Sequence, residues 1–433
     1  MTPAARLAAA AEVLDRIAAG REPAEAALKA WGVAHRYAGS GDRRAIADRV
    51  FRALRHRARL AWAGGGEDGR TLVLFSLALL DGLVLDDIER LYSGEGYGPP
   101  PLTAEERARL DAAPGEPPAW VGAGLPPFVA DDFHSRFGAD WPAEAEALMT
   151  PRAPIDLRVN ALKATREQAA EALRAEGLAP EPTPFSAWGL RLAAEPPPNV
   201  QKLAAFRDGR VEIQDEGSQL AAWLARAAPG ETVVDFCAGG GGKTLALAQQ
   251  MRGEGRLIAC DVEARRVDAI RPRLSRAGQS ADLRVLGPAG EGVEDLDGAA
   301  DLVFVDAPCS GSGTWRRRPE QAWRLTAEEV ERLHALQVDI LARAARLARP
   351  GARLAYVTCS VLSRENEDSA AAFAAAHPEF RSVGIRDALD TPNLTDAARE
   401  RLGELAGEGH TLQLTPRRTG TDGFFVALFQ RLP

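Results

Sequence analysis

Residues 1–145 carry apolar side chains at the three- and four-residue spacings of helices. Ala, Leu, Arg and Glu dominate this part of the chain, and runs of β-branched residues are absent. Within residues 42–61, for example, Ile46, Val50 and Leu54 share one helical face. The pattern predicts a first domain built from helices alone.

The pattern becomes mixed between residues 146 and 214. Residues 155–160 alternate apolar and polar positions like a strand, and Leu190–Leu192 is a candidate for a second strand. Thr165 and Gln168 form a capping box, which predicts a helix that starts there and runs to about Glu176, between the two strands. We therefore expect a small α+β module.

From residue 215 to the end, short apolar runs alternate with helical patterns, which is typical of a parallel sheet with helices on both faces. The fold class is α/β, and the three predicted domains are residues 1–145, 146–214 and 215–433. In the last domain, strands are predicted at 232–236, 256–260, 283–285, 302–305 and 353–358, helices at 244–251, 264–277, 326–347 and 364–376, and a closing hairpin at 411–414 and 423–430.

The composition is that of an ordinary soluble protein, with 45% hydrophobic and 26% charged residues. Glu12 and Asp15 interrupt the Ala-rich amino terminus, which therefore resembles an amphipathic helix and not a signal peptide. The most apolar stretch, residues 72–85, contains Asp81 and is too short to cross a membrane. Four cysteines without paired spacing predict reduced thiols and a cytoplasmic location.

The net charge of −8 hides an uneven distribution. Residues 1–60 hold 12 Lys and Arg against 6 Asp and Glu, so a local charge of +6 faces −14 on the rest of the chain. A basic end on an acidic body favours a localised site for a polyanion. Four arginines at spacings of three or four form either a phosphate-contacting stripe or a solvated helix face: Arg49, Arg52, Arg55 and Arg59.

A glycine loop follows the first strand of the third domain. A Walker A motif is excluded because Cys237 stands where its first glycine is required. Asp261 ends the next strand, where a ribose hydroxyl is bound in dinucleotide folds, so we expect a nucleoside cofactor. Lys243 is either a surface lysine or the partner of a carboxylate from the ligand or from Asp306. The cofactor-binding candidates in the loop are Cys237, Ala238, Gly239, Gly240, Gly241, Gly242 and Lys243.

Two further cysteines stand just after predicted strands. Cys309 lies in Asp306-Ala-Pro-Cys and Cys359 in Thr358-Cys-Ser, fifty positions later. The lack of any Cys-x-x-Cys pair argues against a metal site, and the lack of a neighbouring histidine argues against a Cys-His hydrolase. Cys237 and Cys260 are interpreted as small buried hydrophobes.

A nucleoside cofactor and exposed thiols suit methylation of a pyrimidine at carbon 5. Carbon 5 is a poor nucleophile until a thiolate adds to carbon 6 and gives it enamine character. It can then attack a sulfonium methyl, after which a base removes the carbon-5 proton and the thiol leaves. An acid near ring nitrogen 3 would stabilise the adduct. Two cysteines and Asp306 meet this requirement.

At these motifs the chain resembles the bacterial 16S rRNA 5-methylcytosine methyltransferases of the Sun (Fmu) family, which place a NusB-like helical domain before a class I S-adenosylmethionine domain. The segments that carry the resemblance are Asp235-Phe-Cys-Ala-Gly-Gly-Gly-Gly-Lys-Thr, Asp306-Ala-Pro-Cys-Ser-Gly-Ser-Gly, Thr358-Cys-Ser with Glu365-Asn-Glu, Gly423-Phe-Phe, and residues 41–55, 157–163 and 214–219.

The resemblance implies roles for individual residues. Cys359 would be the nucleophile, Cys309 would assist proton removal and enzyme release, and Asp306 would contact the target base and the cofactor site. The glycine loop would hold the methionine part of S-adenosylmethionine, and Asp261 its ribose. Residues 215–433 would form a Rossmann-like methyltransferase domain, and residues 1–145 and 146–214 would bind RNA, the latter with Arg158 and Lys163. The expected partner is RNA, in particular 16S rRNA, bound by a monomer without metal or membrane.

The chain departs from the family pattern at two places. Gly239 and Gly240 stand where the family usually has Ala-Pro, and Gly287 stands where it has an Asp near the adenine. Two alternatives therefore remain. One is a DNA cytosine carbon-5 methyltransferase that uses a nucleophile like Pro308-Cys309, which leaves Cys359 without a role. The other is an RNA-binding assembly protein with an inactive methyltransferase body.

Overall fold

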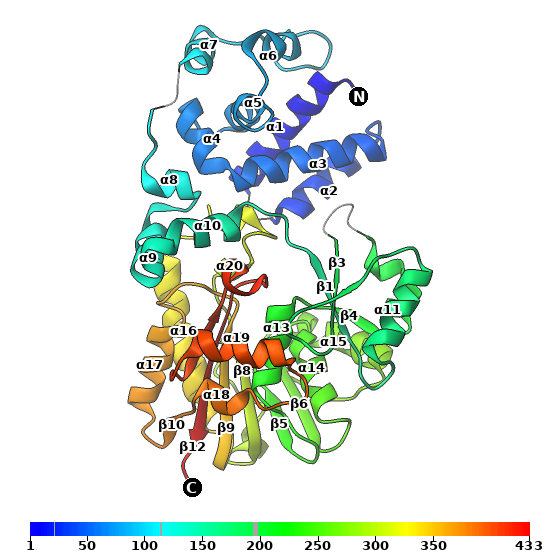
Figure 1. Ribbon diagram of the computed structural model, residues 1–433, viewed down its shortest axis with the longest axis vertical. Helices are drawn as coiled ribbons and strands as arrows, with labels where there is room; N and C mark the ends of the chain where they lie inside the picture. The colour runs from blue at the N-terminus through cyan, green and yellow to red at the C-terminus, as the bar shows by residue number, and fades with distance from the viewer. Residues whose placement is uncertain (21, 113–114, 194–197) are drawn as a thin grey trace. The chain divides into compact units, whose positions relative to one another are not determined.

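The computed structural model describes residues 1–20, 22–112, 115–193 and 198–433 (Figure 1). These residues form two compact units. The first, called the helical unit here, comprises residues 1–151 and 315–325. The second, called the sheet unit, comprises residues 152–314 and 326–433. The chain therefore leaves the sheet unit after Thr314, contributes eleven residues to the helical unit, and returns at Thr326.

The helical unit is built around an apolar core that includes Trp31, Val50, Leu60 and Phe75. No helix among the described residues is long and apolar enough to span a membrane. The helices are α1 (Pro3–Ala19), α2 (Ala24–Ala34), α3 (Ser40–Arg55), α4 (Arg57–Gly64), α5 (Gly69–Leu79), α6 (Leu85–Leu91), α7 (Ala104–Asp111), α8 (Ala119–Ala123), α9 (Pro127–Phe137) and α10 (Trp141–Met149).

The single helix expected across residues 42–61 is two helices. Helix α3 ends at Arg55 and α4 begins at Arg57, with His56 between them at φ −106° and ψ 15°. The apolar positions continue through the junction, with Val50 and Leu54 buried before it and Leu60 buried after it. Apolar spacing alone therefore does not reveal the break, which divides the four-arginine stripe.

Residues 315–325 complete the ends of three helices in the helical unit. The indole Nε1 of Trp323 donates to Leu54 O (3.2 Å), near the carboxyl end of α3. Arg324 donates to Ile17 O (2.7 Å), near the end of α1. Glu320 Oε1 accepts from Ala24 N (3.2 Å) at the start of α2. Terminal backbone groups of helices lack partners within the helix, so this segment satisfies groups that would otherwise need water.

A small four-stranded antiparallel sheet opens the sheet unit, with strand order β2-β3-β1-β4. Thr165 and Gln168 form the expected capping box of its first helix, and Leu157, Val159, Leu173 and Leu190 lie in its core. The predicted strands at 155–160 and 190–192 are both present. The elements are β1 (Ile155–Val159), α11 (Arg166–Ala175), β2 (Glu181–Pro182), β3 (Gly189–Leu192), α12 (Ala204–Arg207) and β4 (Val211–Ile213).

The larger sheet has eight strands in the order β10-β12-β9-β8-β5-β6-β7, with β11 paired to β12. Strands β5 to β9 are parallel, whereas β10, β11 and β12 pair antiparallel. The predicted strands and the closing hairpin are all found, with ends shifted by five residues or fewer. The strands are β5 (Thr232–Asp235), β6 (Arg256–Asp261), β7 (Asp282–Val285), β8 (Ala300–Asp306), β9 (Ala348–Thr358), β10 (Phe380–Ser382), β11 (Thr411–Leu414) and β12 (Phe424–Arg431).

Alternating side chains of these strands build a core on each face of the sheet. On one face, Val233 and Phe304 pack with residues of α13, α14, α18 and α19, and on the other, Val234 and Val303 pack with residues of α16 and α17 (Figure 1). The fold is therefore α/β, with the Rossmann-like arrangement expected for residues 215–433. Its helices are α13 (Glu216–Leu224), α14 (Gly242–Gln250), α15 (Ala264–Ala277), α16 (Ala327–Ala345), α17 (Glu367–Ala376), α18 (Ile385–Ala388), α19 (Asp396–Ala406) and α20 (Pro416–Thr419).

Candidate active site

The carboxyl ends of the parallel strands β5, β6, β8 and β9 meet at one edge of the sheet. This is the edge at which open α/β sheets bind ligands. Strand β5 ends at Asp235, β6 at Asp261, β8 at Asp306 and β9 at Thr358. The residues predicted to bind a cofactor or to catalyse a reaction follow these four ends.

The glycine loop runs from β5 to the first turn of α14. Gly239 and Gly241 have φ of 54° and 81°, which side chains with a Cβ rarely adopt. A Cβ on Gly241 would also lie 2.9 Å from the side chain of Ile270, whereas a Cβ on Gly239 would meet nothing within 4 Å. Gly241 is therefore required by conformation and packing, and the backbone at Gly239 remains open to a ligand.

Asp261 fixes this loop from the neighbouring strand. Its side chain is only 5% exposed, and its Oδ2 accepts from Gly239 N (2.9 Å). Oδ1 accepts from Glu263 N (2.9 Å). A cavity begins beside this carboxylate, and the residues around it include Phe236, Cys237, Gly239, Asp261, Leu286 and Asp306.

Leu286 and Gly290 line this cavity, whereas Gly287, next to Leu286 in the chain, does not. Its N–H donates to Glu291 O (3.0 Å). A Cβ at position 287 would lie 2.3 Å from Glu291 Oε2, so the carboxylate of Glu291 occupies the space that a side chain at 287 would need. The sequence pattern does not identify Glu291, since it stands four positions after the aligned site.

Lys243 and Asp306 form a short ion pair across the site. Their Nζ and Oδ2 atoms are 2.7 Å apart, which confirms the expectation of a carboxylate beside Lys243. The ammonium also lies 5.0 Å from the ring centroid of Phe424. Burial would lower the pKa of Lys243, but the adjacent Asp306 carboxylate raises it above its ordinary value. Lys243 is therefore a fixed positive charge inside the site.

Asp235 lies beneath the same loop and is fully buried. Its Oδ2 accepts from Thr244 Oγ1 at 2.6 Å. Burial raises the pKa of Asp235 to about 7. The bond to Thr244 ties the end of β5 to the first turn of α14.

The structure brings the thiols of Cys309 and Cys359 together. Their Sγ atoms are 3.4 Å apart, and both residues are partly exposed. The hydrogen bond with Cys359 raises the pKa of Cys309, and burial and the charge of Cys359 raise it further. The thiolate of Cys309 is therefore less readily formed while Cys359 stands beside it.

The other two cysteines have different surroundings. Cys260 is fully buried, as expected for a small hydrophobe, and burial raises its pKa to about 12. Cys237 is also expected to be buried, but it is partly exposed and lines the cavity. Among the described residues, no group of three or more His, Cys, Asp or Glu side chains is placed to hold a metal ion.

The four arginines of the predicted stripe have unequal surroundings. Arg49 donates to Ser76 Oγ (3.0 Å) and pairs with Asp81 (2.7 Å). Arg52 also pairs with Asp81, although its side chain is 44% exposed. Arg55 donates to Arg316 O (3.2 Å) in the 315–325 segment. Arg59 is exposed in α4, so Arg52 and Arg59 are the members most open to a phosphate.

Arg158 and Lys163 also differ from one another. Arg158 is 2% exposed and donates to Gln214 Oε1 (2.6 Å) and Gln249 Oε1 (2.8 Å). Burial lowers its pKa to about 10. This position contradicts the expected phosphate contact, because the guanidinium is used inside the protein. Lys163 is exposed, and its Nζ donates to two backbone carbonyl groups.

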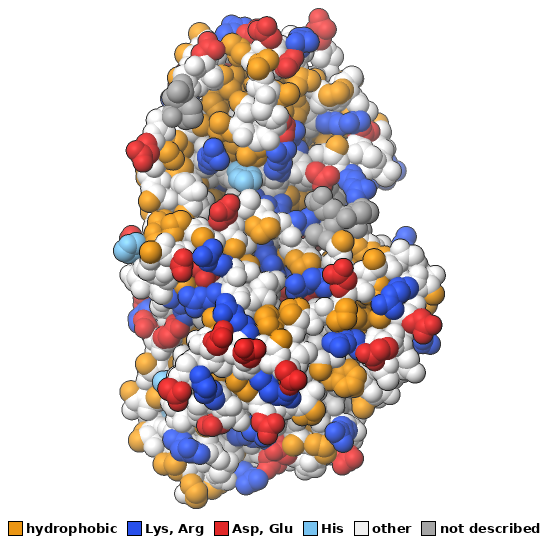
Figure 2. All heavy atoms as spheres, in the orientation of Figure 1, with side chains coloured by type: hydrophobic (Ala, Val, Ile, Leu, Met, Phe, Trp, Pro, Cys, Tyr) orange, Lys and Arg blue, Asp and Glu red, His pale blue; other side chains and the backbone are white. Residues whose placement is uncertain are grey.

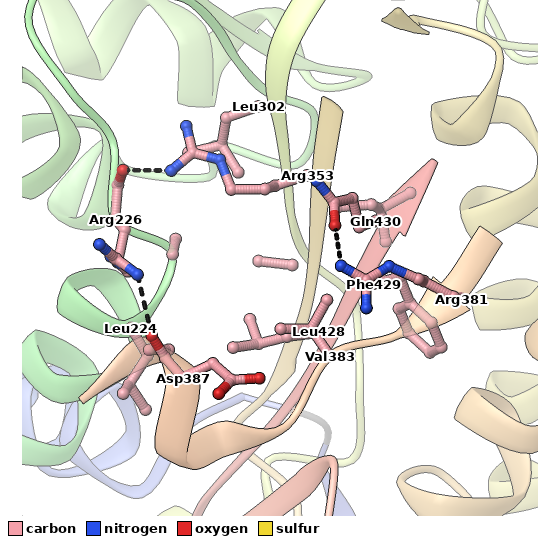
Figure 3. A pocket seen from close by; sticks show the side chains of 14 residues that line it. Leu224, Arg226, Leu302, Arg353, Arg381, Val383, Asp387, Leu428, Phe429 and Gln430 are labelled. Carbon is pink, nitrogen blue, oxygen red and sulfur yellow. Dashed lines mark hydrogen bonds between the residues drawn. The ribbon is translucent and has the colours of Figure 1, made fainter. Parts of the chain in front are cut away.

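A second pocket lies at the opposite, amino-terminal end of the strands (Figure 3). Arg353 donates to the backbone carbonyl of Arg226. The guanidinium of Arg226 donates to the backbone carbonyl of Asp387. Arg381 donates to Gln430. Arg353, Arg381 and Gln430 belong to strands β9, β10 and β12, and Asp387 belongs to α18. None of the residues predicted for the reaction lines this pocket. Figure 2 shows basic and acidic side chains interspersed over the visible face of the sheet unit.

Comparisons with known proteins show the family to which the chain is similar. The family model described as 16S rRNA methyltransferase RsmB/F matches residues 221–430, and that of the RsmF/B-like ferredoxin-like domain matches residues 127–199. Ribosomal RNA small subunit methyltransferase B of Pseudomonas syringae pv. tomato is 34% identical over 67% of this chain and 62% of its own length. The protein of that name from Xanthomonas campestris pv. campestris is 32% identical over 70% and 68%.

The solved structure of PH0851 is similar along the whole chain. It has a TM-score of 0.77 and 25% sequence identity, and the match covers 100% of this chain and 99% of that one. The chain spans 59% to 68% of the length of the first curated relatives that it matches.

Proposed function

Since the chain belongs to the RsmB/F family of 16S rRNA methyltransferases, we propose that it transfers a methyl group from S-adenosylmethionine to carbon 5 of a cytosine in 16S rRNA. The single observation that carries this proposal is the pair of thiols, Cys309 and Cys359, at 3.4 Å beside the Lys243–Asp306 ion pair. We expect the protein to act as a cytoplasmic monomer.

The cavity at the strand ends fits the cofactor. Backbone N–H groups of the glycine loop, with Asp261, would hold the amino acid and ribose parts, and Phe236 and Leu286 offer apolar contacts to an adenine. Glu291, which fills the space beside Gly287, is our candidate to replace the missing Asp near the adenine. When bound, S-adenosylmethionine supplies an electrophilic methyl group.

Cys359 is the nucleophile in this proposal. In this proposal Cys309 donates the hydrogen bond that joins the two thiols, and the positive charge of Lys243 interacts with the Cys359 thiolate. The thiolate forms a bond to carbon 6 of cytosine, and the electron pair of the carbon-5–carbon-6 double bond becomes available at carbon 5. Asp306, held by Lys243, contacts the base.

Cys309 acts in the second half of the reaction. After Cys359 has bonded to carbon 6, it no longer carries the charge or the hydrogen bond that raise the pKa of Cys309. Cys309 therefore releases its own proton to solvent more readily at this stage. Once carbon 5 carries the methyl group, the Cys309 thiolate takes the remaining proton from carbon 5. The electron pair of that C–H bond restores the double bond, and the bond between carbon 6 and Cys359 breaks with release of the thiolate.

Bisulfite sequencing tests the proposal directly. Total RNA from cells with and without the gene should differ at one or more cytosines of 16S rRNA, which are protected only when the gene is present. The gene carrying Cys359→Ala should not restore the protection. An unchanged bisulfite pattern in all rRNA would refute a cytosine carbon-5 activity. Purified protein should also transfer a radioactive methyl group to a 16S rRNA transcript and not to DNA of the same sequence.

A further inference from the structure

A buried carboxylate lies between the loops that carry the two cysteines. Glu365 has 0% exposure. Its Oε1 accepts from Ser310 N (2.7 Å), and its Oε2 accepts from Ser360 Oγ (2.6 Å) and from the hydroxyl of Ser310. Ser310 and Ser360 are the residues that directly follow Cys309 and Cys359. One side chain therefore contacts the chain immediately after each thiol.

Gln337, from α16, extends this connection to the other side of Cys309. Its Nε2 donates to Glu365 Oε1 (3.1 Å) and to Pro308 O (3.0 Å). Both neighbours of Cys309 are therefore connected to Glu365. Ser310 binds it directly, and Pro308 is connected to it through Gln337. Gln337 is fully buried, so these bonds are shielded from water.

The residue after Glu365 fixes the second loop. Thr358 Oγ1 donates to Asn366 Oδ1 (2.6 Å), and Asn366 Nδ2 donates to Ser360 O (3.0 Å). Asn366 therefore contacts the residues on both sides of Cys359. Glu365 and Asn366 together bind both loops from a single turn of the chain.

A carboxylate is suited to this position because all of its hydrogen-bonding sites are acceptors. Glu365 receives two N–H and two O–H groups, and within the described part of the chain it forms no ion pair with Lys or Arg. A buried charge without a counter-ion is unfavourable unless such bonds stabilise it. A glutamine has the same shape but only one acceptor atom, so the hydroxyls of Ser310 and Ser360 would lose the oxygen to which they donate and would have to turn their hydrogens away from its NH2 group.

We propose that Glu365 is a positioning residue that sets the separation of the Cys309 and Cys359 thiols by binding the residues that follow them. This inference rests on the proposed function for its consequence in catalysis, but the geometry that it concerns exists without RNA or cofactor.

Oxidation of the two thiols measures their separation without any methyl transfer. Diamide accepts two electrons and two protons from a pair of thiols, so each disulfide formed is matched by one reduced diamide molecule. In the full-length protein without RNA, mass spectrometry should detect a peptide linked through Cys309 and Cys359 and a loss of two hydrogens. We expect Glu365→Gln to slow this linkage by about tenfold, because the oxygen that accepts from the hydroxyls of both loops is lost.

Matched variants separate positioning from unfolding. Glu331→Gln, at an exposed glutamate paired with Arg364, should leave the linkage rate unchanged. Ser360→Ala removes one of the bonds to Glu365 and should slow the linkage to a smaller extent. Calorimetry with S-adenosylmethionine and thermal melting show whether each variant is folded. A normal linkage rate in folded Glu365→Gln, or in Ser360→Ala if Glu365→Gln does not fold, would overturn the inference.

Kinetics extend the same test to catalysis. Glu365→Gln should lower kcat for RNA methylation by roughly 10²-fold with little change in KM, because it misplaces reacting groups without removing a binding contact. If Glu365→Gln forms the disulfide more slowly than the wild type, but the wild type does not methylate RNA, the proposed function is rejected and the positioning role is retained. If the wild type methylates rRNA, but folded Glu365→Gln forms the disulfide at the wild-type rate, the proposed function is retained and the positioning role is rejected.

Discussion

The Sγ atoms of Cys309 and Cys359 lie 3.4 Å apart, although fifty positions separate the two residues in the chain. Strands β8 and β9 are adjacent and parallel, and their register places Asp306 opposite Val357. Each cysteine follows within three residues of that pair, so both thiols are delivered to the same edge of the sheet. A two-thiol site is therefore a direct consequence of strand order.

The proposed division of roles predicts which variant remains attached to RNA. In Cys309→Ala the adduct between Cys359 and carbon 6 still forms, but the carbon-5 proton is removed slowly. Incubation with 16S rRNA and S-adenosylmethionine should therefore yield a protein–RNA complex that survives denaturing gel electrophoresis. Cys359→Ala should yield no complex and no methylation.

The double variant Cys309→Ala/Cys359→Ala is the control and should yield no complex. A scheme in which Cys309 is the nucleophile, as in the DNA enzymes, predicts the opposite result. In that case only Cys359→Ala would be trapped on the nucleic acid, and the roles assigned here would have to be exchanged.

The pKa of Cys309 should depend on the presence of Cys359. The hydrogen bond and charge of Cys359 raise the pKa of Cys309, so its thiolate forms only at higher pH than in an ordinary thiol. Removing Cys359 removes these causes, and in Cys359→Ala the rate of Cys309 alkylation by iodoacetamide should rise at lower pH than in the wild type. Peptide mass spectrometry measures the alkylation rate of Cys309. Cys260 is fully buried, so its alkylation would show that the protein has unfolded. Identical pH profiles for the two proteins would show that the thiols do not interact.

Lys243 and Asp306 should behave as one unit in catalysis. Lys243→Met removes the ammonium and leaves Asp306 unpaired, and Asp306→Asn removes its partner charge. Each change should lower kcat/KM by about 10²-fold, and the double variant should be little worse than either one. Calorimetry with S-adenosylmethionine identifies any part of the loss that comes from cofactor binding. Multiplicative losses in the double variant would indicate two independent roles.

The arginines of α3 and α4 should separate into two functional groups. Arg52→Ala/Arg59→Ala should weaken binding to a 16S rRNA fragment and reduce the slope of log affinity against log salt by about 2, because each exposed arginine contributes about one phosphate contact. Arg49→Ala should instead reduce the free energy of unfolding by about 1–2 kcal/mol, because it leaves Asp81 with one partner fewer. Fluorescence anisotropy and thermal melting measure the two effects. An unchanged salt slope would make the exposed arginines an ordinary solvated face.

Most of the sheet unit is predictable from the sequence because buried parallel strands are short, apolar and regularly spaced. The runs ending at Asp235, Asp261 and Asp306 are strands as predicted, and their order brings the candidate residues to one edge. A cation at a helix start also indicates a carboxylate near Lys243, although the sequence leaves open whether a ligand or Asp306 supplies it. These features depend on patterns that are local in the sequence.

Other features depend on contacts between distant segments, which a periodic pattern does not contain. Arg158 occupies a strand position typical of an exposed basic residue, yet its partners Gln214 and Gln249 lie 56 and 91 positions later and bury it. Glu365 stands six residues after Cys359, but its bond to Ser310 spans 55 positions. The contribution of residues 315–325 to the helical unit is hidden for the same reason.

The two-part composition of the helical unit has a consequence for the order of events during synthesis. Its first part is finished at residue 151, whereas Trp323 and Arg324 lie in a segment that begins 164 residues later (315 minus 151). The ribosome adds roughly 5–20 residues per second, so the segment that completes the helix ends is synthesised about 10 to 30 s after the helices themselves. During this interval the backbone oxygens of Leu54 and Ile17 can accept hydrogen bonds only from water or from another molecule. The nascent chain therefore exposes, for a defined period, helix ends that the finished protein covers.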